Sequence, residues 1–243
     1  GINGQRRAAE KLLEMGARAP LVKGGHVPGD VIVDVLATQA GEHFFDGPRI
    51  ATRATHGTGC TLASGIAAGI ARFGQIDVLV CNAASNPYYG PLAGISDDQF
   101  NKILSNNIVA NNWLISMVVP QMIERKDGSI IIVSSIGGLR GTEVIGAYAI
   151  SKAADMQLAR NLAVEWGPDN IRINCIAPGL IKTDFAKALH EDPVLSAKYN
   201  NETPLRRMGE PDDIGGVAVF LASPAGQYVT GQTIVADGGM MIR

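Results

Sequence analysis

The sequence has few of the residues that mark several common classes of protein. Only 5% of its 243 residues are aromatic, and its three cysteines are too few and too far apart for a disulfide framework or a metal site. The four histidines show no metal-ligand spacing. Lysine and arginine (21) do not outnumber aspartate and glutamate (23), so no basic excess indicates a nucleic-acid partner. No apolar run reaches the ~18 residues of a membrane span and no signal peptide is visible, so we expect a soluble, cytoplasmic protein.

Glycine (29 residues) and aliphatic residues are plentiful, and 46% of the chain is hydrophobic. That composition favours one α/β domain over residues 1–243, with helices packed closely on a mostly parallel sheet. From residue 76 onward, strand and helix patterns alternate. We expect strands at 76–81, 129–135, 171–177 and 232–236, helices at 96–124, 148–166 and 211–222, and an irregular polar stretch at 181–207.

The first 75 residues follow a different pattern. We expect a helix at 6–15, a short buried strand at 19–23, and the strands of a meander at 31–37 and 42–45, with turns at 28–29 and 46–48. A glycine-rich turn at 55–60 then opens a helix that reaches about residue 73. Unpaired N–H groups and the positive end of the helix dipole coincide at such a turn, which therefore predicts an anion site.

Tyr148 and Lys152 are four residues apart on a predicted helix, so their side chains lie on one face. A free tyrosine, with a pKa of about 10, is a poor acid–base catalyst near neutral pH. A neighbouring ammonium favours the phenolate and lowers that pKa by about one to three units. The pair could therefore exchange a proton with a carbonyl/alcohol couple. The same spacing also fits a core tyrosine beside a lysine whose charged end reaches solvent.

The context of this pair favours the catalytic interpretation. Ser135 ends an apolar strand thirteen residues before Tyr148. A hydroxyl at the carboxyl end of a parallel strand lies where ligands bind in open α/β sheets, so Ser135 could donate to a substrate oxygen. The alternative is that Ser134 or Ser135 only turns the chain.

These motifs, in this order, resemble the short-chain dehydrogenase/reductase family. The resemblance covers residues 72–239 and is most similar to carbonyl reductases of the peroxisomal and bacterial type. It rests on the strand–serine and Y-x-x-x-K motifs, on the strand and turn at 77–84, on Ile171 to Gly179, and on Gly231 to Gly239. The resemblance implies a Rossmann-like, doubly wound, mostly parallel sheet with helices on both faces.

The resemblance also implies roles for single residues. Tyr148 would be the general acid/base, Lys152 would lower its pKa and hold the nicotinamide ribose, and Ser135 would orient the substrate carbonyl. Asn107 matches the asparagine that supports a proton-relay water. The alternative for Asn107 is a mid-helix asparagine bonded to backbone, one of a cluster with its neighbours.

The cofactor implied by the resemblance is NAD or NADP, and the substrate is a small carbonyl or alcohol. Besides Tyr148 and Lys152, the residues expected to contact the cofactor are Asn82, Ala83, Ala84, Pro178, Gly179, Ile181 and Thr183. Ala84 stands where the family usually has glycine, and alanine reduces the backbone conformational freedom of that loop. Residues 184–206 would form a substrate lid, and the closing segment implies a homo-oligomer, either a dimer or a tetramer.

The glycine-rich dinucleotide motif that should open this family is missing from residues 1–71, and Asp77 begins a strand instead of ending one. Residues 8–70 instead resemble the C-terminal part of hydroxymethylpyrimidine phosphate kinases of the ribokinase-like fold, through motifs at 21–26, 48–50 and 55–61. That resemblance implies N-terminal strands of ribokinase-like origin. It also implies a phosphate-binding turn made by Gly57, Thr58, Gly59 and Cys60.

The two resemblances meet in one helix near residues 67–74, so we interpret the chain as a chimera of a ribokinase-like segment (1–71) and a dehydrogenase segment (72–243). Three functions stay open. The first is an NAD(P)-dependent oxidoreductase, although losing the diphosphate-binding turn weakens cofactor binding. The second is a folded but inactive chimera. The third is a phosphate or nucleotide binder that uses the Gly57–Cys60 turn.

Overall fold

The computed structural model describes residues 6–7, 9–10, 13–14, 21–22, 31–38, 41–48, 66, 69–70 and 73–243. The chain divides into two compact units. The first unit consists of Gly1–Leu79, Asn112–Ser129 and Asp169–Ile171, and the second of Val80–Asn111, Ile130–Pro168 and Arg172–Arg243.

An antiparallel sheet in the first unit contains β1 (Leu21–Val22), β2 (Val31–Thr38) and β3 (Gly41–Pro48), in that order. The register pairs the two ends of β2 with Pro48 and Gly41, which makes β2–β3 a tight hairpin. Val35 and Ala37 alternate along β2 and are fully buried, as expected of a strand with one covered face. The predicted meander is therefore confirmed. The predicted turn at 46–48 is wrong, because those residues continue the ladder with β2.

The residues around Asp77 show why this acid opens a strand. Arg125 donates from Nη1 to Asp77 Oδ1 at 2.9 Å and from Nη2 to Ile76 O at 2.9 Å. Gln121 donates from Nε2 to the same Ile76 carbonyl at 2.9 Å. Asp77 thus fixes the end of the helix that carries Arg125 against the start of a strand. This structural role agrees with its place at the beginning of the strand.

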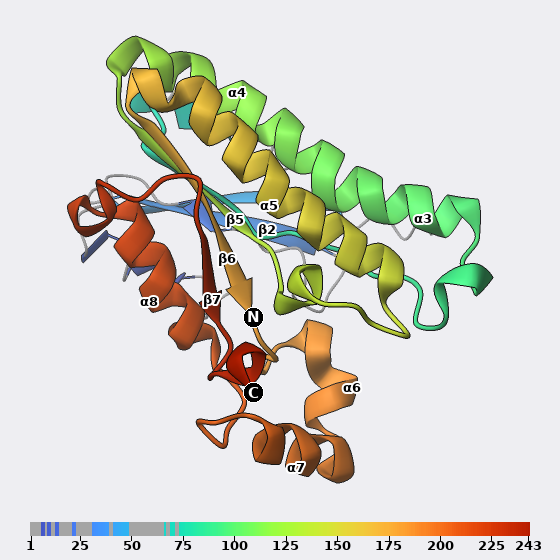
Figure 1. The fold of residues 1–243 in the computed structure, drawn as a ribbon. Helices are drawn as coiled ribbons and strands as arrows, with labels where there is room; N and C mark the ends of the chain where they lie inside the picture. Colours follow the sequence, from blue (N-terminus) through green and yellow to red (C-terminus); the bar gives the residue numbers. More distant parts are fainter. Residues whose placement is uncertain are drawn as a thin grey trace. The chain divides into compact units, whose positions relative to one another are not determined.

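A second sheet has the order β4 (Val78–Cys81), β5 (Gly128–Val133), β6 (Ile171–Pro178) and β7 (Thr233–Ala236). β6 and β7 pair in parallel, with Cys175 opposite Thr233. The residues at 130–132 in β5 are fully buried, which is typical of a strand covered on both faces. Within the second unit, Figure 1 shows α5 (Gly146–Trp166) and α8 (Pro211–Ala222) on opposite sides of the strands. The predicted α/β fold with a parallel sheet and helices on both faces is confirmed.

The helix expected at 96–124 has three parts: α3 (Asp97–Leu104), a π-helical turn η2 (Ser105–Val109) and α4 (Ala110–Arg125). Ser96 forms the capping box that starts α3. At the π-turn, the Ala110 amide donates to Ser105 O, five residues back, and the Asn111 side chain donates to Asn107 O at 2.6 Å. The expectation of one regular helix is wrong here, because a side-chain amide bonds to a carbonyl that the helix ladder would otherwise use.

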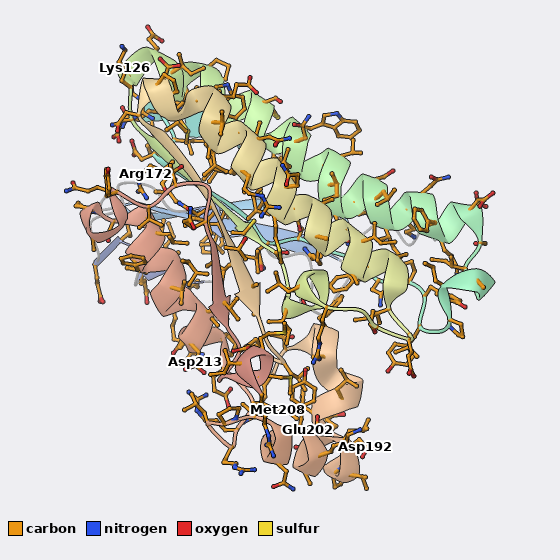
Figure 2. The ribbon with its side chains drawn as sticks, viewed as in Figure 1. Lys126, Arg172, Asp192, Glu202, Met208 and Asp213 are labelled. Atoms are coloured by element: carbon orange, nitrogen blue, oxygen red, sulfur yellow. The ribbon has the colours of Figure 1, made fainter. Side chains whose placement is uncertain are left out.

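The stretch at 181–207 is more regular than its composition indicates. It contains the short helices η5 (Asp184–Ala186) and α6 (Lys187–His190) and the longer α7 (Pro193–Glu202). Asp192 caps α7 by accepting from the amides of Val194 (2.8 Å) and Leu195 (3.0 Å), and a proline occupies the first turn. Figure 2 labels Asp192 and Glu202 at the two ends of this helix. The prediction of an irregular stretch is therefore wrong, since Asp-Pro is a helix-start signal.

Short 3-10 turns connect the remaining elements: η1 (Leu92–Gly94), η3 (Ile136–Leu139), η4 (Gly167–Asp169), η6 (Pro224–Gly226) and η7 (Met240–Ile242). In the first unit, the described residues at 6–7, 9–10 and 13–14 are helical, in agreement with the expected first helix. Among the described residues, no helix has the length and apolar character needed to cross a membrane.

Candidate active site

Tyr148 and Lys152 lie on consecutive turns at the start of α5. The Lys152 Nζ atom lies 5.7 Å from the centre of the Tyr148 ring, which confirms that the two side chains share a face. Lys152 is 1% exposed, whereas Tyr148 is half-buried. The ring of Phe185, from η5, lies 6.0 Å from that of Tyr148, between centroids. The Tyr148 ring thus has both a buried cation and an aromatic ring as neighbours.

Burial raises the pKa of the Tyr148 phenol above its ordinary value. The charge of Lys152 and a hydrogen bond with Ser135 lower that pKa by less, and the negative charge of Asp155 raises it further. The sequence predicts correctly that Lys152 favours the phenolate. The expected net fall of this pKa is wrong, because burial, which depends on tertiary packing, outweighs the charge of Lys152. The phenol is therefore protonated at neutral pH.

Lys152 binds two groups that sequence reasoning did not assign to the site. Its Nζ donates to Val133 O at 2.9 Å and to Asp155 Oδ2 at 2.9 Å. Asp155 is fully buried, and its other carboxylate oxygen accepts from Asn111 Nδ2 at 3.0 Å. Burial raises the pKa of Asp155, while Lys152 and Asn111 lower it by less. The i,i+3 spacing of lysine and aspartate was the one local signal that could have revealed the pair.

Ser134 and Ser135 follow β5 and have different partners. Ser135 has an extended backbone, and its Oγ accepts from Gly137 N at 3.0 Å, so it does turn the chain. The same side chain lowers the pKa of the Tyr148 phenol. Ser134 Oγ donates to Lys152 O at 2.7 Å. The turn-forming alternative therefore describes the contacts of this serine pair, and the donation of Ser135 to a substrate oxygen stays a prediction.

Gly138 lets the turn that follows Ser135 approach α5 closely. A Cβ atom at Gly138 would lie 2.6 Å from Ala153 N and 2.7 Å from Lys152 C, both backbone atoms. A side chain there would force η3 away from the helix. The separation between the elements that carry Ser135 and Tyr148 therefore depends on a glycine. Sequence reasoning missed this residue, because the approach occurs between segments far apart in the chain.

Asn107 lies in the π-turn and is fully buried. Its Oδ1 accepts from Ser85 N at 2.8 Å, and its Nδ2 donates to Ser85 O at 3.1 Å and to Ser151 Oγ at 2.9 Å. Ser151 Oγ in turn donates to Tyr148 O at 2.7 Å. The alternative of a backbone-bonded asparagine therefore describes its contacts well. Those contacts also connect the loop after β4 to the helix turn that carries Tyr148.

The residues expected to contact a cofactor follow β4 and β6. Asn82, Ala83 and Ala84 come directly after β4, and Asn82 is exposed. Pro178 ends β6, and Gly179 donates from N to Ala236 O at 3.0 Å. Ile181 forms a parallel bridge with Gly209, and Thr183 is exposed. Because carboxyl ends of parallel strands meet at one edge of a sheet, these loops and Ser135 share the edge at which ligands of such sheets bind.

Two further expectations concern anion and metal binding. The predicted phosphate turn, at Gly57, Thr58, Gly59 and Cys60, lies outside the described residues. Within the part of the chain that the structure describes, no three His, Cys, Asp or Glu side chains are grouped to hold a metal ion.

Comparison with known families assigns both parts of the chain. Residues 49–241 match the family model described as enoyl-(acyl carrier protein) reductase. Residues 2–85 match the phosphomethylpyrimidine kinase model. The second match confirms the predicted kinase resemblance of the N-terminal segment, and the overlap at 49–85 includes the helix in which the two resemblances were expected to meet.

Individual relatives are similar to the larger part. Dehydrogenase/reductase SDR family member 4 of Oryctolagus cuniculus is 41% identical over 174 residues, which cover 72% of this chain and 67% of the relative. The Sus scrofa protein of the same name is 40% identical and is covered over 64% of its length, so the chain spans about two thirds of these relatives. A Burkholderia cenocepacia gluconate 5-dehydrogenase, solved in complex with NADP and tartrate, superimposes with a TM-score of 0.72 at 32% identity, over 76% of this chain and 72% of that one. The family match and these identities show that the chain belongs to the short-chain dehydrogenase/reductase family.

Proposed function

We propose that the chain is an NAD(P)-dependent oxidoreductase acting on a carbonyl/alcohol pair. One observation carries the proposal: the Tyr148 phenol lies beside the Lys152 ammonium, and the Ser135 side chain is near enough to lower the pKa of the phenol. These are a proton donor, a cation and a hydroxyl that can orient a carbonyl oxygen. The family of the chain and its NADP-bound neighbour support the same reaction class.

The chemistry of the site residues follows from their protonation states. When bound, a reduced nicotinamide supplies the hydride that adds to the substrate carbonyl carbon. Ser135 would donate a hydrogen bond to the carbonyl oxygen, and Tyr148 would transfer its phenolic proton to the same oxygen. A raised phenol pKa keeps that proton in place at neutral pH, which favours reduction. Alcohol oxidation needs the phenolate, so its rate should rise with pH until Tyr148 has titrated.

The donor groups present fit the nicotinamide end of a dinucleotide. An ammonium has three N–H groups, and Val133 O and Asp155 take two of those of Lys152. The third is available for a ribose hydroxyl. We propose that the loops at 82–84 and 178–183 contact the rest of the nicotinamide half of the dinucleotide. The sequence supports either NAD or NADP, because the motif that usually discriminates between them is missing from residues 1–71.

Direct titration of NADH and NADPH, followed by calorimetry, tests the proposal. We expect at least one of them to bind and to support reduction of a small carbonyl compound. Tyr148→Phe should then abolish turnover while cofactor affinity changes little, because the phenol is needed for proton transfer. Absence of binding at millimolar cofactor would refute the proposal. Equal rates for Tyr148→Phe and the unmodified chain would refute the assigned mechanism.

The kinase match at residues 2–85 favours a second candidate function, phosphate or nucleotide binding by the Gly57–Cys60 turn in an otherwise inactive chimera. If the turn binds anions, ATP or inorganic phosphate should protect Cys60 from thiol reagents. Cys175 provides an internal reference, because it is buried and burial raises its pKa to about 12. Unchanged labelling of Cys60 at saturating ATP would contradict this candidate.

We further propose that the chain forms a homo-oligomer in a reducing compartment such as the cytoplasm. The widely spaced cysteines suit such a compartment. Tyr228 is fully exposed and Ile242 is 90% exposed, and we propose these two side chains as contacts with a second copy. Sedimentation of the unmodified chain and of a Tyr228→Ser/Ile242→Ser variant tests this. A monomer at micromolar concentration in both cases would refute it.

A further inference from the structure

Lys152 and Asp155 form an ion pair that is almost completely removed from solvent. The Nζ–Oδ2 distance is 2.9 Å, and the side chains are 1% and 0% exposed. A third polar group completes the arrangement, since Asn111 Nδ2 donates to the other carboxylate oxygen at 3.0 Å. Every heavy atom of the two charged ends therefore has a partner within hydrogen-bond distance.

A buried ion pair is weak evidence for stability, because removing two charges from water costs about as much as their attraction returns. The geometry indicates a different role. The carboxylate and Val133 O hold two of the three N–H groups of the ammonium, so they also fix the direction of the third. Asn111 fixes the carboxylate in turn, and it belongs to the helix that follows the π-turn of Asn107.

We propose that Asp155 is a positioning residue for Lys152, holding the ammonium in the interior so that a single N–H faces the group that binds beside Tyr148. The proposal rests on the oxidoreductase function proposed above. It assigns a role to a residue that no motif in the sequence analysis included. Asp155 itself is hydrogen-bonded to Lys152 and Asn111, and touches the reaction only through Lys152.

The groups around Asp155 determine how its removal should be observed. Tyr148 and Lys152 face it from the same helix, Cys175 faces it from β6 and donates from Sγ to Asp155 O at 3.4 Å, and Asn111 faces it from α4. Asn111 is uncharged, and the Cys175 thiol, with a pKa of about 12, is also uncharged at neutral pH. Arg160 and Cys81 act on Cys175 from further away. The carboxylate is therefore the negative charge that opposes Lys152 near the phenol.

Titration of Tyr148 in the cofactor-free protein tests the proposal. The protein is labelled with 3-fluorotyrosine, whose more acidic phenol titrates below denaturing pH, and the Tyr148 fluorine resonance is assigned by its loss in Tyr148→Phe. Asp155→Asn keeps the size of the side chain but leaves the ammonium without its counter-ion. We expect the Tyr148 midpoint to fall by about one unit. Glu165→Gln, a change at an exposed carboxylate of the same helix, should leave it unchanged. An unchanged or higher midpoint in Asp155→Asn overturns the proposal.

A second measurement uses the unmodified chain, in case Asp155→Asn does not fold. A buried, hydrogen-bonded ammonium exchanges its protons slowly, so ¹⁵N-lysine spectra at neutral pH should contain one protected Nζ resonance that Lys152→Met removes. Absence of that resonance overturns the proposal. Neither measurement needs a cofactor. Failure of NADH and NADPH to bind would therefore refute the oxidoreductase function and leave the positioning of Lys152 intact. An unchanged Tyr148 midpoint together with cofactor binding would refute the positioning of Lys152 and leave the oxidoreductase function intact.

Discussion

Asp155 and Asp213 are both paired with a cation, yet their pKa values move in opposite directions. Asp155 pairs with Lys152 in the interior, and its pKa is raised because burial outweighs the effect of its partners. Asp213, at the start of α8 (Figure 2), accepts two hydrogen bonds from Arg207, at 2.6 and 2.8 Å, on the surface. Its pKa is lowered by those bonds and by the Glu210 amide. The environment of the pair, rather than the presence of a partner, decides the direction.

The two ion pairs have different roles, although each joins a carboxylate to a cation. At Asp213, water remains available to both charges, so the pair organises the start of α8 with little effect on stability. At Asp155, both charged side chains are buried, so each charge depends on the other for solvation. The buried pair is therefore sensitive to the loss of one partner, and the exposed pair is not. The variants below test that difference.

The largest effect is expected from removing one charge of the buried pair. Asp155→Leu or Lys152→Met alone should lower the free energy of unfolding by about 3–5 kcal/mol, because each leaves an uncompensated charge in the interior. The double variant Lys152→Met/Asp155→Leu leaves no charge and should recover most of that loss. Urea denaturation followed by circular dichroism measures all four proteins. Additive losses in the double variant would show that the charges do not depend on each other.

A smaller effect is expected from adding a side chain where η3 packs against the backbone of α5. Gly138→Ala places a methyl group 2.6–2.7 Å from backbone atoms of Lys152 and Ala153, and overpacking of this kind costs about 1–3 kcal/mol. It should also separate Ser135 from Tyr148 and so slow turnover. Gly141→Ala is the matched control, because a Cβ there meets nothing within 4 Å. Equal unfolding midpoints for the two variants would contradict the close approach of η3 and α5.

The sequence predicted the parts of this fold that depend on local patterns. The strands predicted at 129–135 and 171–177 match β5 and β6 to within about two residues at each end, and the apolar residues at 130–133 are what a strand covered on both faces needs. The tyrosine–lysine pair followed from helical spacing alone. The strand-like runs at 31–37 and 42–45 likewise predicted the antiparallel meander, although not how far β3 continues.

The features that sequence reasoning missed depend on contacts between distant segments. Asn111 and Asp155 are 44 residues apart, and so are Asn107 and Ser151. No local pattern indicates that a mid-helix asparagine will hydrogen-bond with a buried carboxylate, or that a π-turn will form beside it. The net direction of the Tyr148 pKa was missed for the same reason, since burial is set by tertiary packing. The missed helix α7 is different, because Asp192 and the proline after it gave a local signal.

The smallest effect is expected at the exposed pair. Asp213→Asn removes a charge whose side chain is 39% exposed, so the melting temperature at neutral pH should change little and the change should vanish in high salt. The dependence of stability on pH follows from the lowered pKa of Asp213. Ionisation of this carboxylate stabilises the fold above its unfolded pKa of about 4, and that stabilisation is lost as pH falls through the lower folded pKa. The melting temperatures of the unmodified chain and of Asp213→Asn should therefore converge as the pH falls below about 4. A large loss at neutral pH that persists in high salt would show that the exposed pair behaves like the buried one.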